Sequence, residues 1–102
     1  MHNRASQMYI FHILKTSGSF TKAAKELGVS TSHVSKQLMQ LESELNVQLV
    51  QRSTRNLTLT DAGVQFAKYC ARLYLAIQNA EAFMKKEIEQ SSRTLRIALP
   101  SS

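Results

Sequence analysis

The sequence contains one cysteine and one proline in 102 residues, and it has no tryptophan. Because a single cysteine, Cys70, cannot form an intramolecular disulfide, we expect the protein in a reducing compartment. Cys70 lies within an apolar helical pattern, which favours a small core or interface residue over a reactive thiol. The chain also lacks a run of about 18 apolar residues and an N-terminal signal region. We therefore expect a cytoplasmic protein without a membrane-spanning segment.

Acidic residues are scarce, since seven Asp and Glu stand against 13 Lys and Arg, giving a net charge of +6 and an isoelectric point near 9.8. Such an excess of basic residues favours a polyanionic partner such as nucleic acid, although a moderate charge also keeps ordinary proteins soluble. With 43% apolar residues, the chain can bury one modest core. Length and composition thus predict a single small domain.

The three histidines, His2, His12 and His33, are not accompanied by carboxylates or cysteines at ligand or catalytic spacing. We therefore expect neither an enzyme nor a bound metal or cofactor. His12 alternates between apolar neighbours, and we expect it at a helix surface or at the edge of the core.

Apolar residues at helical spacing predict two short helices near the start of the chain. The first covers residues 5–17 and ends at Gly18. The second is capped by Ser19 and ends before Gly28. Its consecutive alanines at positions 23–24 are small enough to let two helices cross closely.

A third predicted helix is capped by Ser30 and reaches about Leu45. Its apolar residues form one stripe, which we expect to be buried: Val34, Leu38, Leu41 and Leu45. The opposite face carries Ser32, Lys36, Met39 and Ser43, flanked by His33, Ser35 and Gln40. A short helix, a glycine-containing turn and a longer helix with such an outer face form a helix-turn-helix arrangement.

Two short segments with strand character follow, at residues 48–51 and 56–59, and predict a small hairpin, or wing. Arg52 and Arg55 lie at its tip, where they are placed to reach a phosphate or a minor groove. Two solvated surface arginines are the alternative, and the preceding helix-turn-helix favours DNA contact. The predicted fold is mainly α, with three helices and a two-stranded wing followed by a long helix.

The long helix begins after a cap at Thr60 and covers residues 61–89, a length of about 44 Å. Apolar residues recur along it at nearly coiled-coil spacing and form a predicted dimer seam of Phe66, Cys70, Leu73, Ile77, Ala80, Met84 and Ile88. A second stripe consists of Val64, Ala67, Ala71 and Tyr74. Because a small core covers only one face, we expect the other to pack on a second copy, with packing inside a monomer as the alternative.

After residue 89, the helical spacing of apolar residues gives way to other patterns. Residues 90–93 are polar and predict a linker, and residues 95–99 alternate like a strand that has nothing to pair with. The predicted organisation is a winged helix-turn-helix domain over residues 1–60, a linker helix over 61–89, and over 90–102 a hinge with the first strand of an absent domain.

The stretch from Gly18 to Gly63, GSFTKAAKELGVSTSHVSKQLMQLESELNVQLVQRSTRNLTLTDAG, resembles the amino-terminal signature of the LysR-type transcriptional regulators. The resemblance extends to the first helix and to the linker helix. It also includes Leu95–Ala98, a segment that looks like the opening strand of the family's effector-binding domain. It implies a sequence-specific DNA-binding transcription regulator that binds a dyad-related operator as a dimer. It also implies that the full-length protein can form a tetramer and that a small-molecule inducer binds the absent domain.

By this resemblance, the family's base-edge positions are occupied by Thr31, Ser32, Ser35 and Lys36, and its wing contacts by Arg52 and Arg55. Lys36 stands where arginine is usual, so we expect its base readout to be less rigid. His33 replaces a small residue and is expected either to add a contact or to clash.

We hypothesise that the third helix lies in the major groove of double-stranded DNA, while Thr21 and Lys22 anchor phosphates from the start of the second helix. The alternative function is a winged-helix module for protein association, whose basic face meets an acidic partner. DNA binding that weakens steeply as salt rises would separate the two functions.

Overall fold

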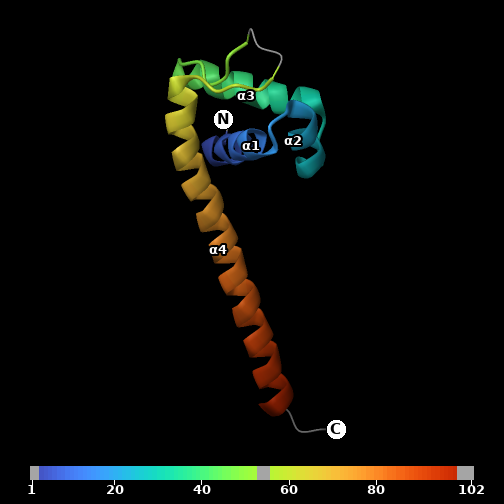
Figure 1. Cartoon of the computed structure of the whole chain (residues 1–102). Coiled ribbons are helices and arrows are strands. Elements are labelled where there is room, and N and C mark those ends of the chain that lie inside the picture. The colour runs from blue at the N-terminus through green and yellow to red at the C-terminus, as the bar shows by residue number, and fades with distance from the viewer. Residues whose placement is uncertain (1–2, 53–55, 99–102) are drawn as a thin grey trace.

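The computed structural model describes residues 3–52 and 56–98, with side chains described as far as residue 91. These residues form four helices, which are α1 (Arg4–Ser17), α2 (Phe20–Leu27), α3 (Thr31–Leu45) and α4 (Asp61–Ala98). The first three gather around the N-terminal part of α4, and the rest of α4 extends away from them as a rod (Figure 1). The fold is mainly α, in agreement with the sequence prediction.

The helices begin and end where local signals in the sequence predict. The side-chain oxygens of Ser19, Ser30 and Thr60 each accept a hydrogen bond from the backbone N–H three residues further on, at 3.0 to 3.1 Å. Each bond satisfies an N–H that has no partner inside its own helix. Gly18 and Gly28 end α1 and α2 with φ of 81° and 69°, a left-handed conformation that glycine adopts without steric cost.

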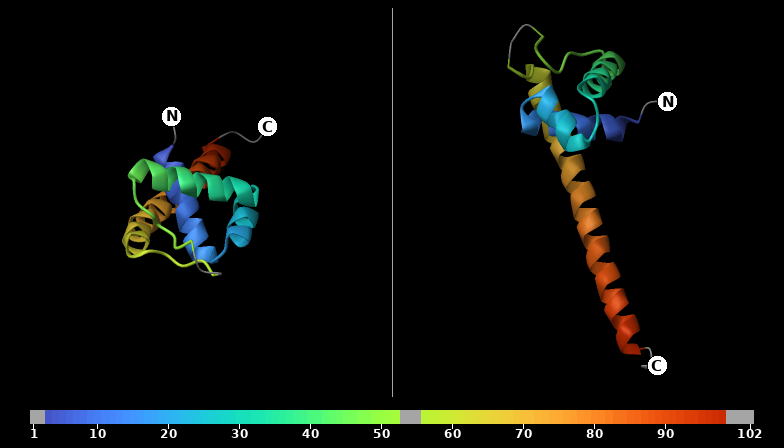
Figure 2. Two further views of the ribbon diagram at one scale, coloured as in Figure 1. Left: turned by 90° about the horizontal axis from the view of Figure 1, so that it is seen from above. Right: turned by 90° about the vertical axis from the view of Figure 1, so that its right-hand side faces the viewer.

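The core forms where α1 meets the other helices. α1 contacts α2, α3 and α4, and in the view from above it runs beneath α3 between α2 and α4 (Figure 2). Ala23 and Ala24 are buried in α2, so the predicted close crossing of helices is confirmed. The largest fully buried apolar side chains are Phe11, Leu14, Val34, Leu41 and Leu49.

The wing is present but short. Val50 and Leu59 form a single antiparallel bridge, and no regular strand occurs in the described residues of this region. Two backbone hydrogen bonds flank the bridge, from the Thr60 N–H to the Leu49 carbonyl at 3.0 Å and from the Gln51 N–H to the Thr58 carbonyl at 2.8 Å. The Leu49 N–H does not bond to Thr60 in return. Leu49 donates its own N–H to the Glu42 side chain, and the Thr60 carbonyl accepts from the Val64 N–H in α4. The ladder stops there because both backbone groups have other partners.

α4 is longer than predicted. The expected linker at residues 90–93 and the strand expected from residue 95 are wrong, because the helix continues to Ala98. Between Gly63 and Pro100 the sequence has no glycine or proline that would interrupt a helix. A strand at this position would also leave its backbone groups unpaired, whereas a helix satisfies them within the segment. Leu99 lies outside the described residues.

Candidate nucleic-acid interface

The outer face of α3 is not covered by any described part of the chain. Its exposed side chains are Thr31, Ser32, His33, Lys36, Met39 and Ser43, and Ser35 is half-buried beside them. An open hollow along this face is lined by Ser32, Ser35, Lys36, Met39, Gln40 and Ser43. The predicted division of α3 is confirmed for its outer face and for Val34, Leu38 and Leu41, which are buried, whereas Leu45 is half-buried.

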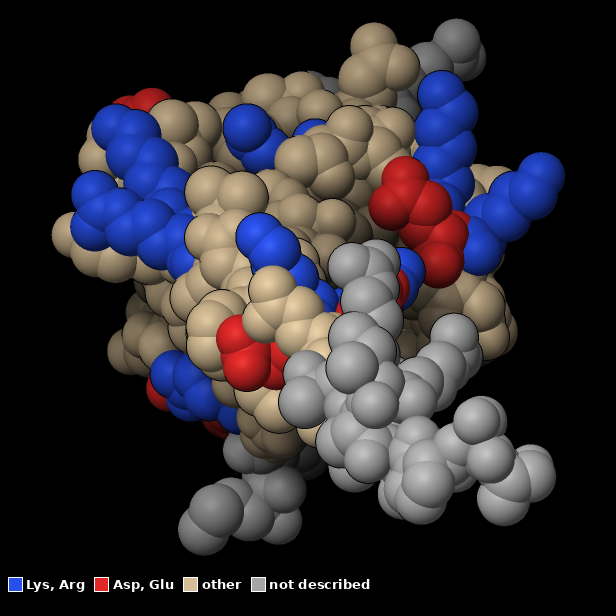
Figure 3. Space-filling view, turned by 90° about the horizontal axis from the view of Figure 1, so that it is seen from below, with Lys and Arg blue, Asp and Glu red and all other residues tan. Residues whose placement is uncertain are grey.

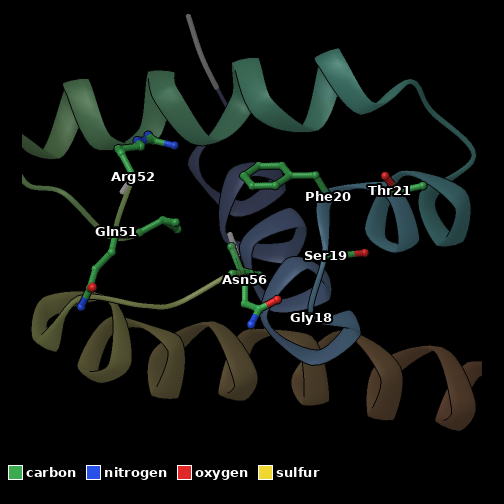
Figure 4. Close-up of a pocket in the computed structure, with 9 residues that line it drawn as sticks. Gly18, Ser19, Phe20, Thr21, Gln51, Arg52 and Asn56 are labelled. Carbon is green, nitrogen blue, oxygen red and sulfur yellow. The ribbon is translucent and has the colours of Figure 1, made fainter. Parts of the chain in front are cut away.

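The start of α2 and the base of the wing border a second hollow. Thr21 and Lys22 lie in the first turn of α2, and both are exposed. Residues 18–21 line one side of a hollow of about 370 Å³, and Gln51, Arg52 and Asn56 are among the residues that line it from the wing (Figure 4). The structure therefore brings Thr21 and Arg52, which are 31 positions apart, to the same recess. Lys22 follows Thr21 directly in the sequence but does not line the recess.

Arg52 is bound within the chain. Its Nη2 donates to Oε1 of Glu42, whose side chain is only 9% exposed, while the Arg52 side chain is 42% exposed. The other carboxylate oxygen of Glu42 accepts from the backbone N–H of Leu49 at 2.7 Å and of Val50 at 3.2 Å. One carboxylate thus joins the C-terminal part of α3 to both backbone and side chain of the wing. Arg55 lies outside the described residues.

Sequence reasoning missed Glu42, although a signal for it exists. Leu38, Leu41 and Leu45 belong to the predicted buried stripe, and position 42 falls among them at helical spacing. A carboxylate on the buried side of a helix needs donors for its oxygens. The nearest stretch that could supply them is the wing, which follows α3 directly.

The first part of the predicted dimer seam belongs to the core of the chain. Cys70 has no exposed surface, and burial raises the pKa of its thiol to about 11. Phe66 is half-buried, with its ring centroid 6.0 Å from that of Phe11 in α1. The prediction that Cys70 lies in a dimer interface is wrong, because α1 packs on this side of α4. The sequence alternative of a small core residue is confirmed.

Tyr74 and His12 form the far edge of the contact between α1 and α4. Their rings stack at a centroid distance of 4.3 Å, and the ring centroid of Tyr9 lies 5.3 Å from that of Tyr74. Burial lowers the pKa of His12, and the positive charge of Lys15 lowers it further. The expectation that His12 lies at a helix surface or at the edge of the core is confirmed, and its ring packs on Tyr74.

From residue 79 to residue 91, every side chain of α4 is exposed in this chain. Leu73 and Ile77 are half-buried, whereas Ala80, Met84 and Ile88 are exposed. At 100° per residue these five side chains lie on one side of the helix. Other exposed apolar side chains of α4 are Val64, Tyr69, Leu75 and Phe83. An apolar stripe of this length on a protruding helix is typical of a surface that packs on another molecule.

Basic side chains do not gather into a single patch on the side of the molecule opposite α3. Viewed from the C-terminal end of α4, lysines and arginines form several separate groups with other residues between them (Figure 3). Charge alone therefore does not mark this side as a binding surface. Within the part of the chain that the structure describes, no group of His, Cys, Asp and Glu could hold a metal ion, and no helix is apolar enough over a sufficient length to cross a bilayer.

Residues 5–64 match the family model for bacterial regulatory helix-turn-helix proteins of the lysR family. The chain belongs to the LysR family. Two LysR-family relatives are the HTH-type transcriptional activator AaeR of Escherichia coli K12 and the HTH-type transcriptional regulator CrgA of Neisseria meningitidis serogroup B. AaeR is 35% identical over 99 residues, covering 97% of this chain and 32% of AaeR. CrgA is 32% identical over 102 residues, covering 98% and 34%. The chain spans about a third of the length of these relatives.

Solved structures of LysR-family proteins share the fold. The BenM DNA-binding domain in complex with benA site 1 DNA has a TM-score of 0.72 and 31% identity, covering 85% of this chain and 97% of that one. Full-length AphB of Vibrio cholerae has a TM-score of 0.67 and 29% identity, covering 84% and 28%. These similarities confirm the winged helix-turn-helix followed by a long helix.

Proposed function

We propose that this chain is the DNA-binding part of a LysR-type transcription regulator, with α3 as its recognition helix. The observation that carries the proposal is the exposed outer face of α3, which presents hydroxyl, imidazole and ammonium groups to solvent. Such groups read base edges in a major groove, which is wide enough to admit an α-helix. The similarity to a BenM domain that was solved with DNA supports the same role.

Base contacts in this proposal come from the first half of α3, from Thr31, Ser32, His33, Ser35 and Lys36. Thr21 and Lys22 contact the phosphate backbone from the first turn of α2, where unpaired N–H groups also favour an anion. Arg55 reaches the DNA from the wing. Besides the wing contact expected from the sequence, Arg52 has a second role. Its pairing with Glu42 orients the wing, while part of the side chain stays open to solvent.

Lys36 provides the direct test. DNA bound by the protein is first selected from a random pool at a stated salt concentration, which gives the half-site sequence and spacing. Lys36→Ala is then expected to cost about 1 to 3 kcal/mol on the selected site, because a base contact is lost, and to relax selection at one base position. Lys85→Ala, on the exposed part of α4, is the matched control and should bind like the unaltered chain. An equal loss on every sequence would make Lys36 a phosphate contact instead.

We further propose that two copies associate through α4, so that two recognition helices face a dyad-related operator. The interface is the stripe formed by Leu73, Ile77, Ala80, Met84 and Ile88. Phe66 and Cys70 are left out of it, since both pack inside the chain.

Ile77→Glu tests the proposed dimer. A carboxylate placed within an apolar interface is expected to give a monomer in sedimentation velocity and to lower operator affinity about tenfold, or about 1.4 kcal/mol. Leu75→Glu introduces the same charge on another side of α4, where Leu75 is 56% exposed, and should leave the dimer intact. If Leu75→Glu dissociates the dimer and Ile77→Glu does not, the interface lies on the other side of the helix.

In this proposal, the complete regulator also contains parts that this chain does not include. Residues after α4 lead into an effector-binding domain that holds a small-molecule inducer, and the complete protein acts in the cytoplasm as a dimer or tetramer. The alternative is a winged helix that binds an acidic protein. A strong fall in DNA affinity with rising salt, together with sequence preference, supports the regulator, whereas salt-independent or absent DNA binding supports the alternative.

A further inference from the structure

Met39 is an apolar side chain on the otherwise polar outer face of α3. The other apolar residues of this helix face inward, since Val34, Leu38 and Leu41 are buried and Leu45 is half-buried. Met39 is 58% exposed and packs into no described part of the core. Apolar surface left in water contributes nothing to folding stability, so this side chain is available to bind something else.

The position of Met39 aligns it with the proposed base-reading residues. Ser32, Lys36, Met39 and Ser43 follow one another at helical spacing and line the same open hollow. Met39 follows Lys36 by three residues, or about 4.5 Å along the helix axis, and base pairs are about 3.4 Å apart. When Lys36 lies at a base edge, Met39 therefore reaches the next base pair or the one after it.

The chemistry of Met39 selects one feature of the groove. A thioether has no N–H or O–H to donate and is a weak acceptor, so it forms at most weak hydrogen bonds with the polar edges of guanine, cytosine or adenine. The apolar feature of the major groove is the 5-methyl group of thymine. Because the side chain is unbranched and polarisable, it can adjust to a methyl group whose position depends on local DNA shape.

We propose that Met39 is a specificity-determining residue that contacts the 5-methyl group of a thymine one or two base pairs from the base read by Lys36. This inference rests on the proposed function, because it requires α3 to lie in the major groove. It adds an apolar element to a recognition surface whose other members are hydroxyl, imidazole and ammonium groups.

Deoxyuridine substitution tests the proposal with the smallest chemical change. Each thymine of the selected operator is replaced in turn by deoxyuridine, which removes the methyl group and keeps base pairing. For the unaltered chain, one replacement is expected to weaken binding about fourfold, the effect of burying about one methyl-sized group. The Met39→Ala variant should bind the selected operator and the operator with that one replacement equally well. The contribution of every other thymine should stay unchanged.

Two further variants make the test specific. Ser43→Ala alters the same face one turn further along and should keep the preference for thymine, whereas Met39→Leu should keep part of it. If no replacement weakens binding, or if the thymine preference survives in Met39→Ala, the inference is wrong although sequence-selective binding stands. If the unaltered chain shows no sequence-selective DNA binding at all, the proposed function itself is wrong.

Discussion

The Glu42→Ala variant is expected to unfold at a distinctly lower denaturant concentration than the unaltered chain, with a loss of about 3 kcal/mol in the free energy of unfolding. The substitution removes the acceptor of two backbone N–H groups, those of Leu49 and Val50, in a buried part of the chain. A buried donor without a partner costs about 1 to 3 kcal/mol, and two are created together. Arg52 also loses its partner, but its part-exposed side chain can be hydrated, so this loss adds little.

Two controls identify the cause of the Glu42→Ala effect. Glu42→Gln keeps one acceptor oxygen and should lose less stability than the alanine variant. Glu44→Ala removes a more exposed carboxylate of the same helix, one that pairs with Arg4 at 3.1 Å, and should cost about 1 kcal/mol or less. If Glu42→Ala and Glu44→Ala are equally stable by urea unfolding, the carboxylate of Glu42 does not hold the wing.

Glu42 also connects folding to the proposed DNA contacts. The wing meets the start of α2 at the recess lined by Thr21 and Arg52, while its backbone is held at the C-terminal part of α3. A wing without that anchor has fewer interactions to keep it beside the recognition helix. Glu42 is therefore a positioning residue for the wing, although it does not lie on the face proposed to meet DNA.

The helices and the outer face of α3 could be predicted because their signals are local. Ser19 and Ser30 cap helices wherever their oxygens meet an unpaired N–H, and Gly28 ends a helix through its own backbone freedom. The exposed face of α3 then follows as the complement of its buried stripe. None of these inferences needs knowledge of which distant segments come together.

The sequence indicates that Glu42 needs donors, but it does not identify Arg52 as one of them, and it does not say which helix covers Cys70. Glu42 and Arg52 are ten residues apart and on different elements, so only the folded chain brings them together. α4 carries two apolar stripes, and periodicity alone does not say which of them α1 covers. The structure assigns Cys70 to the core and leaves Ile88 exposed, although both fit one seam in the sequence. α4 extends further along the chain than the sequence predicts, because the alternating pattern from residue 95 is weak evidence for a strand without a partner.

Gly63→Ala is expected to destabilise the chain, although helix propensity alone predicts the opposite. Gly63 lies in the first turn of α4, where replacing glycine by alanine normally stabilises a helix by up to about 1 kcal/mol. Here a Cβ atom would overlap the carbonyl oxygen of Leu49 and lie 3.0 Å from its carbonyl carbon. Both atoms belong to the backbone, so no side-chain rotation relieves the overlap. We expect a loss of about 2 to 3 kcal/mol in the free energy of unfolding, as for other overpacked sites.

The sign of the Gly63→Ala effect distinguishes close packing from helix propensity. The same Leu49 carbonyl accepts the Thr60 N–H at 3.0 Å, so movement away from the new methyl group would weaken the hydrogen bond between Leu49 and Thr60, the residue that caps α4. Ala62→Gly is the neighbouring control, and because Ala62 is exposed it should cost only the propensity difference of about 1 kcal/mol. A Gly63→Ala variant that unfolds at a higher urea concentration than the unaltered chain would mean that α4 can move from Leu49 without loss, and that the wing is not held where this structure places it.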